Sequence, residues 1–239
     1  MSVLSQHSLF NFQTELFLLL ILISFFLIGS FFTLVITLVK RQKKITLVKT
    51  KKAYESQIES YILSFLFEND EQATADFIKN PNSKKTLFKK LTMKYCLTMH
   101  QNYTGTIQTS ILDFLYKTNM ISYSREKIKS NIWKHKVEAI RDLSTLNDRE
   151  SLPTIQKLIS HSNKKIAIES IIALIKFDGI GTLSHLKTIS FPIDDWSQAL
   201  ILSVIKNNKI PYDDSIKVLQ QSKNQSIQLL ASRIIQFYN

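Results

Sequence analysis

The chain of 239 residues has few of the residues that interrupt or cross-link regular structure. It contains four glycines, four prolines and one cysteine, Cys96. A single cysteine excludes an internal disulfide, in keeping with a reducing compartment, and four glycines exclude a glycine-rich phosphate loop. Sheet proteins need many turns rich in glycine and proline, so this composition favours long helices with short connections. We therefore predict an all-α fold.

The sequence also lacks the short motifs of catalysis and metal binding. It has no P-loop, dinucleotide-binding glycine motif, serine-hydrolase elbow or zinc-protease helix motif. Cys96 and His100 have the i, i+4 spacing of two metal ligands, but a closed zinc site needs two more. Glu138 and Glu169 are 31 positions apart, which is the period of the repeat described below. Glutamates that recur in this way are more often solvated or salt-bridged than catalytic. We expect a non-enzymatic protein without cofactor or metal, whereas an enzyme would require a deep polar pocket with shifted pKa values.

Charge is absent from the 24 positions between Leu16 and Val39. A helix of this length spans roughly 36 Å, which is enough to cross a ~30 Å hydrocarbon core. A buried core helix is the alternative, but such helices are usually shorter and keep a polar face. A cleavable signal peptide fits poorly, because the first 13 residues carry no positive charge and the apolar run is too long. We predict a single transmembrane helix over 14–39.

Seven basic residues and no acid follow this run, within the juxtamembrane segment 40–52. The only charged side chain before the run is Glu15. The positive-inside rule then predicts a short non-cytoplasmic N-terminus (1–13) and a cytoplasmic C-terminal part, at the inner membrane. Two interpretations stay open for the basic residues: they fix topology alone, or they also contact anionic lipid headgroups. These residues are Lys40, Arg41, Lys43, Lys44, Lys49, Lys51 and Lys52.

The formal net charge of the chain is +12, and the seven basic residues account for more than half of it. A nucleic-acid-binding protein would combine basic and aromatic residues on one folded surface, or carry a recognisable module. The sequence shows neither, so we expect no nucleic-acid partner.

Residues 53–130 are predicted to form a helical membrane-proximal domain. Helical spacing of apolar residues is clear in three of its stretches, whereas 119–130 reads as a polar connection. Ser83 is expected to cap the helix over 84–100. That helix is amphipathic and basic, which suits either a core-facing helix or one lying on a membrane surface. The predicted helices are 53–68, 70–79, 84–100 and 104–118.

The chain repeats itself from about residue 131, with a period near 31. Ala139 and Leu143, for example, are matched 31 positions later by Ser170 and Leu174. Each unit contains two helical stretches, and Asn163 is placed to cap one of them. Two antiparallel helices in about 30 residues predict an α-solenoid of about three and a half repeats over 131–239.

The stretch from Val137 to Gly179 resembles tandem HEAT repeats of the short bacterial kind. The resemblance is good over 131–190 and loose over 194–239, where Asn207 and Asn208 replace an expected turn aspartate. It implies an α-solenoid scaffold that binds proteins, and says little about activity. The positions that match are Ala139, Leu143, Asp148, Leu152, Pro153, Leu158, Ile166, Ser170, Ala173 and Leu174.

Two features predict an interaction surface in this array. Trp133 and Trp196 each open a first helix; Trp133 is expected to pack against 84–118, and Trp196 to anchor an interface. The last helix is apolar and has no polar helix after it, so we expect a partner or a second copy of the chain to cover it. The predicted interface residues are Trp196, Leu229, Ile235 and Phe237.

Together these patterns predict a single-pass, membrane-anchored adaptor that acts as an accessory subunit of an inner-membrane complex. Its partner would be an integral membrane protein, such as a glycosyltransferase or a transport machine. The alternative is a membrane-bound sensor or regulator whose helical domain binds lipid headgroups or a small ligand.

Overall fold

A computed structural model describes residues 3–68 and 70–239, and the side chains from residue 16 onward apart from those of 69 and 188. About 82% of the chain is helical and no strand occurs in this described part. The all-α prediction is therefore confirmed. Residues 1–2 of the predicted N-terminal segment, and Asn69 before the second predicted helix, lie outside the described residues. The chain divides into two units, Met1–Tyr54 and Glu55–Asn239.

The first unit consists of the first part of helix α1, which runs from Val3 to Phe67. The helix is continuous over 45–48, a stretch that contains the β-branched residues Ile45, Thr46 and Val48. The side chains of Leu16–Val39 are all exposed, and none of the most apolar window is buried against protein. The hydroxyls of Thr33 and Thr37 donate to helix carbonyls, each over 2.8 Å, as is usual in an apolar surrounding. By length and composition, α1 is a helix that could cross a membrane.

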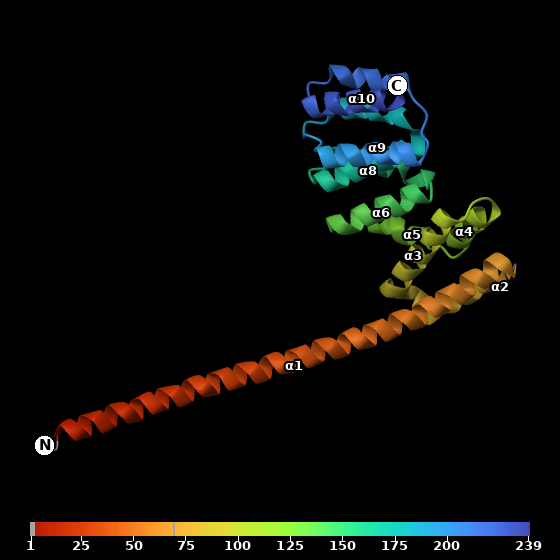
Figure 1. Ribbon diagram of the computed structural model, residues 1–239. Helices are drawn as coiled ribbons and strands as arrows, with labels where there is room; N and C mark the ends of the chain where they lie inside the picture. Colours follow the sequence, from red (N-terminus) through yellow and green to blue (C-terminus); the bar gives the residue numbers. More distant parts are fainter. Residues whose placement is uncertain (1–2, 69) are drawn as a thin grey trace. The chain divides into compact units, whose positions relative to one another are not determined.

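The N-terminal part of the second unit is a small cluster of helices (Figure 1), and its core is aromatic. Phe77 lies at its centre, with ring centroids 5.6 Å from Phe88 and 5.3 Å from Phe114. Phe65, near the end of α1, packs 5.5 Å from Phe114. After α1, the elements are α2 (Gln72–Lys79), η1 (Pro81–Lys84), α3 (Thr86–Asn102), α4 (Thr106–Lys117) and α5 (Ile121–Lys127).

Helix α3 faces this core, and its start differs from the prediction. Ser83 lies buried in the preceding 3₁₀ turn, where its hydroxyl donates to the Asn80 carbonyl over 2.7 Å. Lys85 occupies the N-cap position without a side-chain cap bond, so Ser83 is not the cap. Of the two interpretations of this helix, the structure favours the core-facing one, because Phe88, Leu91 and other residues of its apolar face are buried in protein.

Helix α5 replaces the polar connection predicted over 119–130. Its buried residues Ile121 and Ser124, and Ile128 just beyond it, have helical spacing. The helix packs against α6. Only two turns long, it presents too few apolar positions for periodicity to be seen in the sequence.

The C-terminal part alternates longer α-helices with shorter helical segments. Figure 1 shows α6, α8, α9 and α10 in successive layers, and α8 packs on both α6 and α9. Ala139 of α6 and Ser170 of α8 are fully buried, as expected for small residues between close helices. The α-helices are α6 (Trp133–Thr145), α7 (Leu152–Lys157), α8 (Lys164–Asp178), α9 (Asp195–Asn207) and α10 (Gln225–Tyr238).

The second helical stretch of each predicted unit is shorter or tighter than expected. Two of them are 3₁₀ helices rather than α-helices, η4 (Ile180–Thr188) and η5 (Asp214–Gln221). The short 3₁₀ helices η2 (Arg149–Ser151) and η3 (Leu158–Ser160) flank α7. Gly181 and the β-branched residues of η4 weaken α-helix formation there. Three longer helices begin with the expected type of cap, because Asn163, Asp194 and Asn224 each accept a bond from a backbone amide.

Two aspartates 30 positions apart, called the turn aspartates, lie after α6 (Asp148) and at the end of α8 (Asp178), and each binds an arginine side chain. Asp148 is buried and pairs with Arg125 of α5. Asp178 pairs with Arg149, at the start of η2. Each bond joins segments more than 20 positions apart, so it ties neighbouring layers together and could not be read from local sequence.

Candidate functional site

The seven predicted basic residues all lie on α1 with exposed side chains, directly after the apolar run. A helix turns by 100° per residue, so Lys40, Lys43 and Lys44 share one side of it, and Arg41 lies on another. The positive charge is therefore spread around the helix, as suits a segment that emerges from a bilayer among headgroups on all sides.

The four predicted interface residues do not form one patch. Trp196 lies in the first turn of α9 with 81% of its surface exposed. Phe237 lies at the other end of this layer, because the hydroxyl of its neighbour Tyr238 donates to the carbonyl of Ile210, just after α9. Helix α9 is about 20 Å long at 1.5 Å per residue. Leu229 and Phe237 on α10 are partly exposed, and Ile235 is half-buried.

The two tryptophans instead line one groove of about 440 Å³ at the N-terminal ends of α6, α8 and α9. Trp133 was expected to pack against 84–118, but the structure places it on the side of α6 that faces α8, with Lys165 Nζ 4.8 Å from its ring centroid. We name this surface the tryptophan groove. Its lining is Trp133, Val137, Arg141, Lys164, Lys165, Ile168, Glu169, Phe191, Pro192, Ile193, Asp194, Trp196, Ser197 and Leu200.

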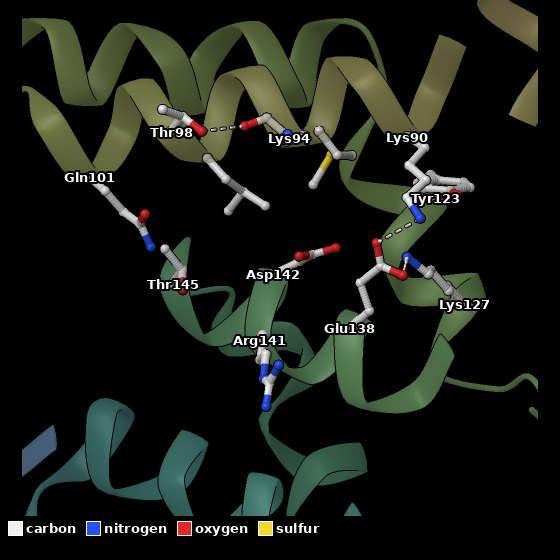
Figure 2. A pocket seen from close by; sticks show the side chains of 12 residues that line it. Lys90, Lys94, Thr98, Gln101, Tyr123, Lys127, Glu138, Arg141, Asp142 and Thr145 are labelled. Atoms are coloured by element: carbon white, nitrogen blue, oxygen red, sulfur yellow. Dashed lines mark hydrogen bonds and ion pairs between the residues drawn. The ribbon is translucent and has the colours of Figure 1, made fainter. Parts of the chain in front are cut away.

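A second hollow, of about 250 Å³, lies between α3, α5 and α6; Figure 2 shows Lys90 and Lys127 directed toward Glu138, whereas Arg141 points away from them. We name it the polar pocket. Four cations and two carboxylates line it, together with uncharged residues of α3 and α6. The charged residues are Lys90 and Lys94 from α3, Lys127 from α5, and Glu138, Arg141 and Asp142 from α6.

Most of these charges are already engaged with one another. Glu138 accepts from Lys127 at 2.7 Å and lies 3.7 Å from Lys90 (dashed lines in Figure 2). Arg141 pairs with Glu169, in the wall of the tryptophan groove, at 2.7 Å. The two glutamates that recur one predicted unit apart are thus both salt-bridged, as expected.

Asp142 is the exception, since it is buried without an ion pair among the described residues. Its carboxylate accepts a bond of 3.1 Å from the buried Ser124 hydroxyl. Burial raises its pKa from 3.8 to about 6, and Lys127 and the Ser124 bond only partly oppose the rise. The pocket therefore contains the kind of shifted group that general acid–base chemistry needs.

Cys96 and His100, which have the spacing of two metal ligands, are both buried. Cys96 is fully buried and burial raises the pKa of its thiol, so little thiolate forms. Burial lowers the pKa of nearby His100. Within residues 3–68 and 70–239, no group of three or more His, Cys, Asp or Glu could hold a metal ion.

We expect Asp142→Asn to stabilise the fold at neutral pH. A carboxyl group whose pKa is raised from 3.8 to about 6 on folding stabilises the native state below pH 4 and loses that contribution as pH rises through 6. The amide keeps an acceptor for Ser124 and removes the cost of burying charge, worth about 1–3 kcal/mol at pH 7. Thermal unfolding at pH 4 and pH 7 should show the gain at pH 7 only.

Glu138→Gln is the matched control from the same pocket. Burial alone would raise the pKa of Glu138, but the bond from Lys127 and the charges of Lys127 and Lys90 together outweigh burial and keep that pKa below its usual value. This replacement should therefore destabilise the fold at pH 7. If Asp142→Asn also lowers the unfolding temperature at pH 7, the charged carboxylate of Asp142 stabilises the fold, and the interpretation above is wrong.

No family model, curated protein or solved structure matches the chain. The resemblance of 131–190 to HEAT repeats stays a prediction.

Proposed function

We propose that the chain is a membrane-anchored helical scaffold that holds a partner protein beside the membrane. The observation that carries the proposal is the uncharged run Leu16–Val39, whose side chains are exposed and find no protein to pack against. Burying such a surface in lipid removes it from water at roughly 25 cal/mol per Å². A leader sequence passes the same tests of length and composition, and the basic segment that follows the run supports an anchor instead.

The orientation and the architecture belong to the same proposal. The excess of basic residues over 40–52 supports an N-terminus outside and a cytoplasmic C-terminal part, at the inner membrane of a bacterium. The 31-residue spacing and the layered order of α6, α8 and α9 support a HEAT-like array over 131–239. An exposed Trp196 beside an apolar groove supports binding to a protein partner. An integral membrane protein, such as a glycosyltransferase or a transporter, fits an adaptor that is itself anchored.

A second function, sensing of a small anionic ligand, is favoured by the polar pocket. Lys90, Lys94, Lys127 and Arg141 surround one hollow, and Lys94 forms no ion pair in the described part of the chain. The other three cations are engaged by carboxylates, so a ligand would have to compete with Glu138 and Glu169. For this reason we place the scaffold function first.

Purification of the tagged full-length chain from its native membrane in mild detergent tests the scaffold function. We expect one integral membrane protein to co-purify in near-equimolar amount, and to be absent when an unrelated tagged single-span protein is the bait. A chain that elutes alone as a single species would contradict the scaffold function. A homo-oligomer without a second protein would favour the sensor.

A further inference from the structure

The tryptophan groove combines an exposed aromatic anchor with an apolar floor. Trp196 is 81% exposed, although covering a side chain of this size with protein contributes substantially to binding. The neighbouring lining includes Val137, Ile168 and Leu200 from three successive helices. The groove is therefore a continuous surface across α6, α8 and α9, and large exposed aromatics beside apolar hollows are typical of binding hot spots.

The lysines around the groove lack ion pairs, whereas most of the nearby carboxylates are bonded within the chain. Lys164 and Lys165 line the groove with exposed side chains, and Lys134 is exposed beside Trp133. None of the three lysines forms an ion pair in the part of the chain that the structure describes. Lys134 and Lys165 lie over the Trp133 ring, at 5.7 and 4.8 Å from its centroid. The rim therefore offers positive charge next to aromatic surface.

The carboxylates near the groove are already bonded within the chain. Glu169 pairs with Arg141 at 2.7 Å. Asp194 caps α9 by accepting from the Ser197 amide at 2.7 Å, which holds the pKa of Asp194 below its usual value. Asp195 pairs with Arg233 at 2.7 Å. A ligand thus meets Lys164 and Lys165 without ion pairs and Glu169 already paired with Arg141, whereas Asp194 is bonded to a backbone amide and attracted by Lys164.

We propose that the tryptophan groove binds an acidic peptide segment of the partner protein, with apolar side chains packing on Trp196 and carboxylates facing Lys164 and Lys165. This inference rests on the proposed scaffold function and specifies its partner surface. An anionic membrane would also attract lysine and tryptophan, but a bilayer is flat and cannot enter a hollow of about 440 Å³ between helices. A peptide can enter the hollow, so the observations favour a peptide.

The sequence supplies a reporter for this groove, because Trp133 and Trp196 are the two tryptophans of the chain and both line it. Intrinsic tryptophan fluorescence therefore reports on the groove in the full-length protein. Trp133→Phe leaves Trp196 as the single emitter, and occupation of the groove should shift its emission to the blue as water is displaced.

The experiment titrates full-length Trp133→Phe protein, held in phosphatidylcholine nanodiscs, with a synthetic tryptophan-free peptide in which Glu and Asp alternate with Leu and Phe. We expect a saturable blue shift. A peptide with Lys in place of every Glu and Asp should give none. Lys164→Glu combined with Lys165→Glu should weaken binding of the acidic peptide by about tenfold.

Two matched changes control for net charge and for the anchor. Lys157→Glu with Lys206→Glu removes the same charge at exposed lysines that do not line the groove, and should leave the affinity unchanged. Trp196→Ala, read by peptide anisotropy, should weaken binding by about thirtyfold. Because Trp196 is exposed, this variant retains the core, and an unchanged unfolding temperature would verify that.

Three results would overturn the inference. An equal response to the acidic and basic peptides would mean that apolar contact alone drives binding, and would overturn the inference. So would the absence of any shift, or a shift produced by phosphatidylglycerol vesicles but not by the acidic peptide, which would assign the groove to the membrane surface.

Failure of this inference and failure of the scaffold function can be told apart. If a membrane protein co-purifies equally with the native chain and with Trp196→Ala, the scaffold function stands and the groove is not its partner surface. If the acidic peptide binds but no protein co-purifies from membranes, the groove binds peptides and the scaffold function is wrong.

Discussion

Two lysines placed in the uncharged run, Ile23→Lys and Leu27→Lys, are expected to abolish stable membrane association. Both positions lie near the middle of Leu16–Val39 and are exposed on α1. Each lysine at the centre of a transmembrane helix costs about 3 kcal/mol on insertion scales, and the lost apolar residues add to that cost. A total of about 6 kcal/mol corresponds to a change of more than about 10⁴-fold in the partition between membrane and water.

Alkaline carbonate extraction of membranes measures this directly, because it strips peripheral proteins and leaves integral ones. The native chain should stay in the pellet and the double variant should appear in the supernatant or be degraded. The control adds the same charge at exposed apolar residues of the second unit, Ile78→Lys and Val218→Lys, and should stay in the pellet.

Two outcomes would contradict the anchor. Retention of the Ile23→Lys, Leu27→Lys variant in the carbonate-washed pellet would mean that the run Leu16–Val39 is not what holds the protein in the membrane. A native protein whose measured mass lacks the N-terminal apolar run would mean that this run is a leader that is removed. In that case α1 would be no anchor in the mature protein.

The sequence predicts well those features that depend on neighbours along the chain. Asn163 caps α8 because an Asn side chain reaches an amide two residues on, and this needs no knowledge of the fold. The same holds for the uncharged run of α1, since its length and composition suffice to predict a helix that could cross a membrane. The apolar face of α3 also follows from helical periodicity, although whether protein or lipid covers it does not.

Features that depend on packing between distant segments were missed. Trp133 and Trp196 are 63 positions apart, and they line one groove only because α6, α8 and α9 begin at the same edge of the second unit. Asp142 is unremarkable in the sequence; its raised pKa needs the burial and the Ser124 bond that α5 provides. Periodicity identifies which face of a helix is buried, but not which charged groups are brought to that face.

Arg125→Ala is expected to destabilise the second unit by about 3–5 kcal/mol, because it leaves a buried carboxylate without its counter-charge. The Asp148 side chain is fully buried, whereas that of Arg125 is 29% exposed. Arg125 Nε donates to Asp148 at 2.9 Å, and the hydroxyls of Ser151 and Tyr116 also donate to this carboxylate. A neutral side chain at 125 would leave two hydroxyls to stabilise a buried negative charge.

Arg149→Ala is the matched control, since Arg149 binds the other turn aspartate, Asp178, in an exposed pair. The side chains there are 54% and 36% exposed, and exposed pairs contribute about 0–1 kcal/mol. Thermal unfolding of the full-length chain in detergent, followed by the emission of the two tryptophans, reads out the second unit. Arg125→Ala should lower the midpoint by roughly 10 °C, and Arg149→Ala by much less.

The pH dependence separates a lost counter-charge from simple loss of packing. In the native chain burial alone would raise the pKa of Asp148, but the bonds from Arg125 and Ser151 outweigh it and lower that pKa. This pair therefore stabilises the fold above about pH 4 and loses its effect as pH falls further. Without Arg125, burial dominates and the pKa of Asp148 rises, so the variant should regain stability as pH falls from 7 toward 5.

Arg125→Ala combined with Asp148→Asn should recover part of the loss at pH 7. If Arg125→Ala costs no more than Arg149→Ala, or shows no recovery at lower pH, the buried pair does not hold α5 to this turn.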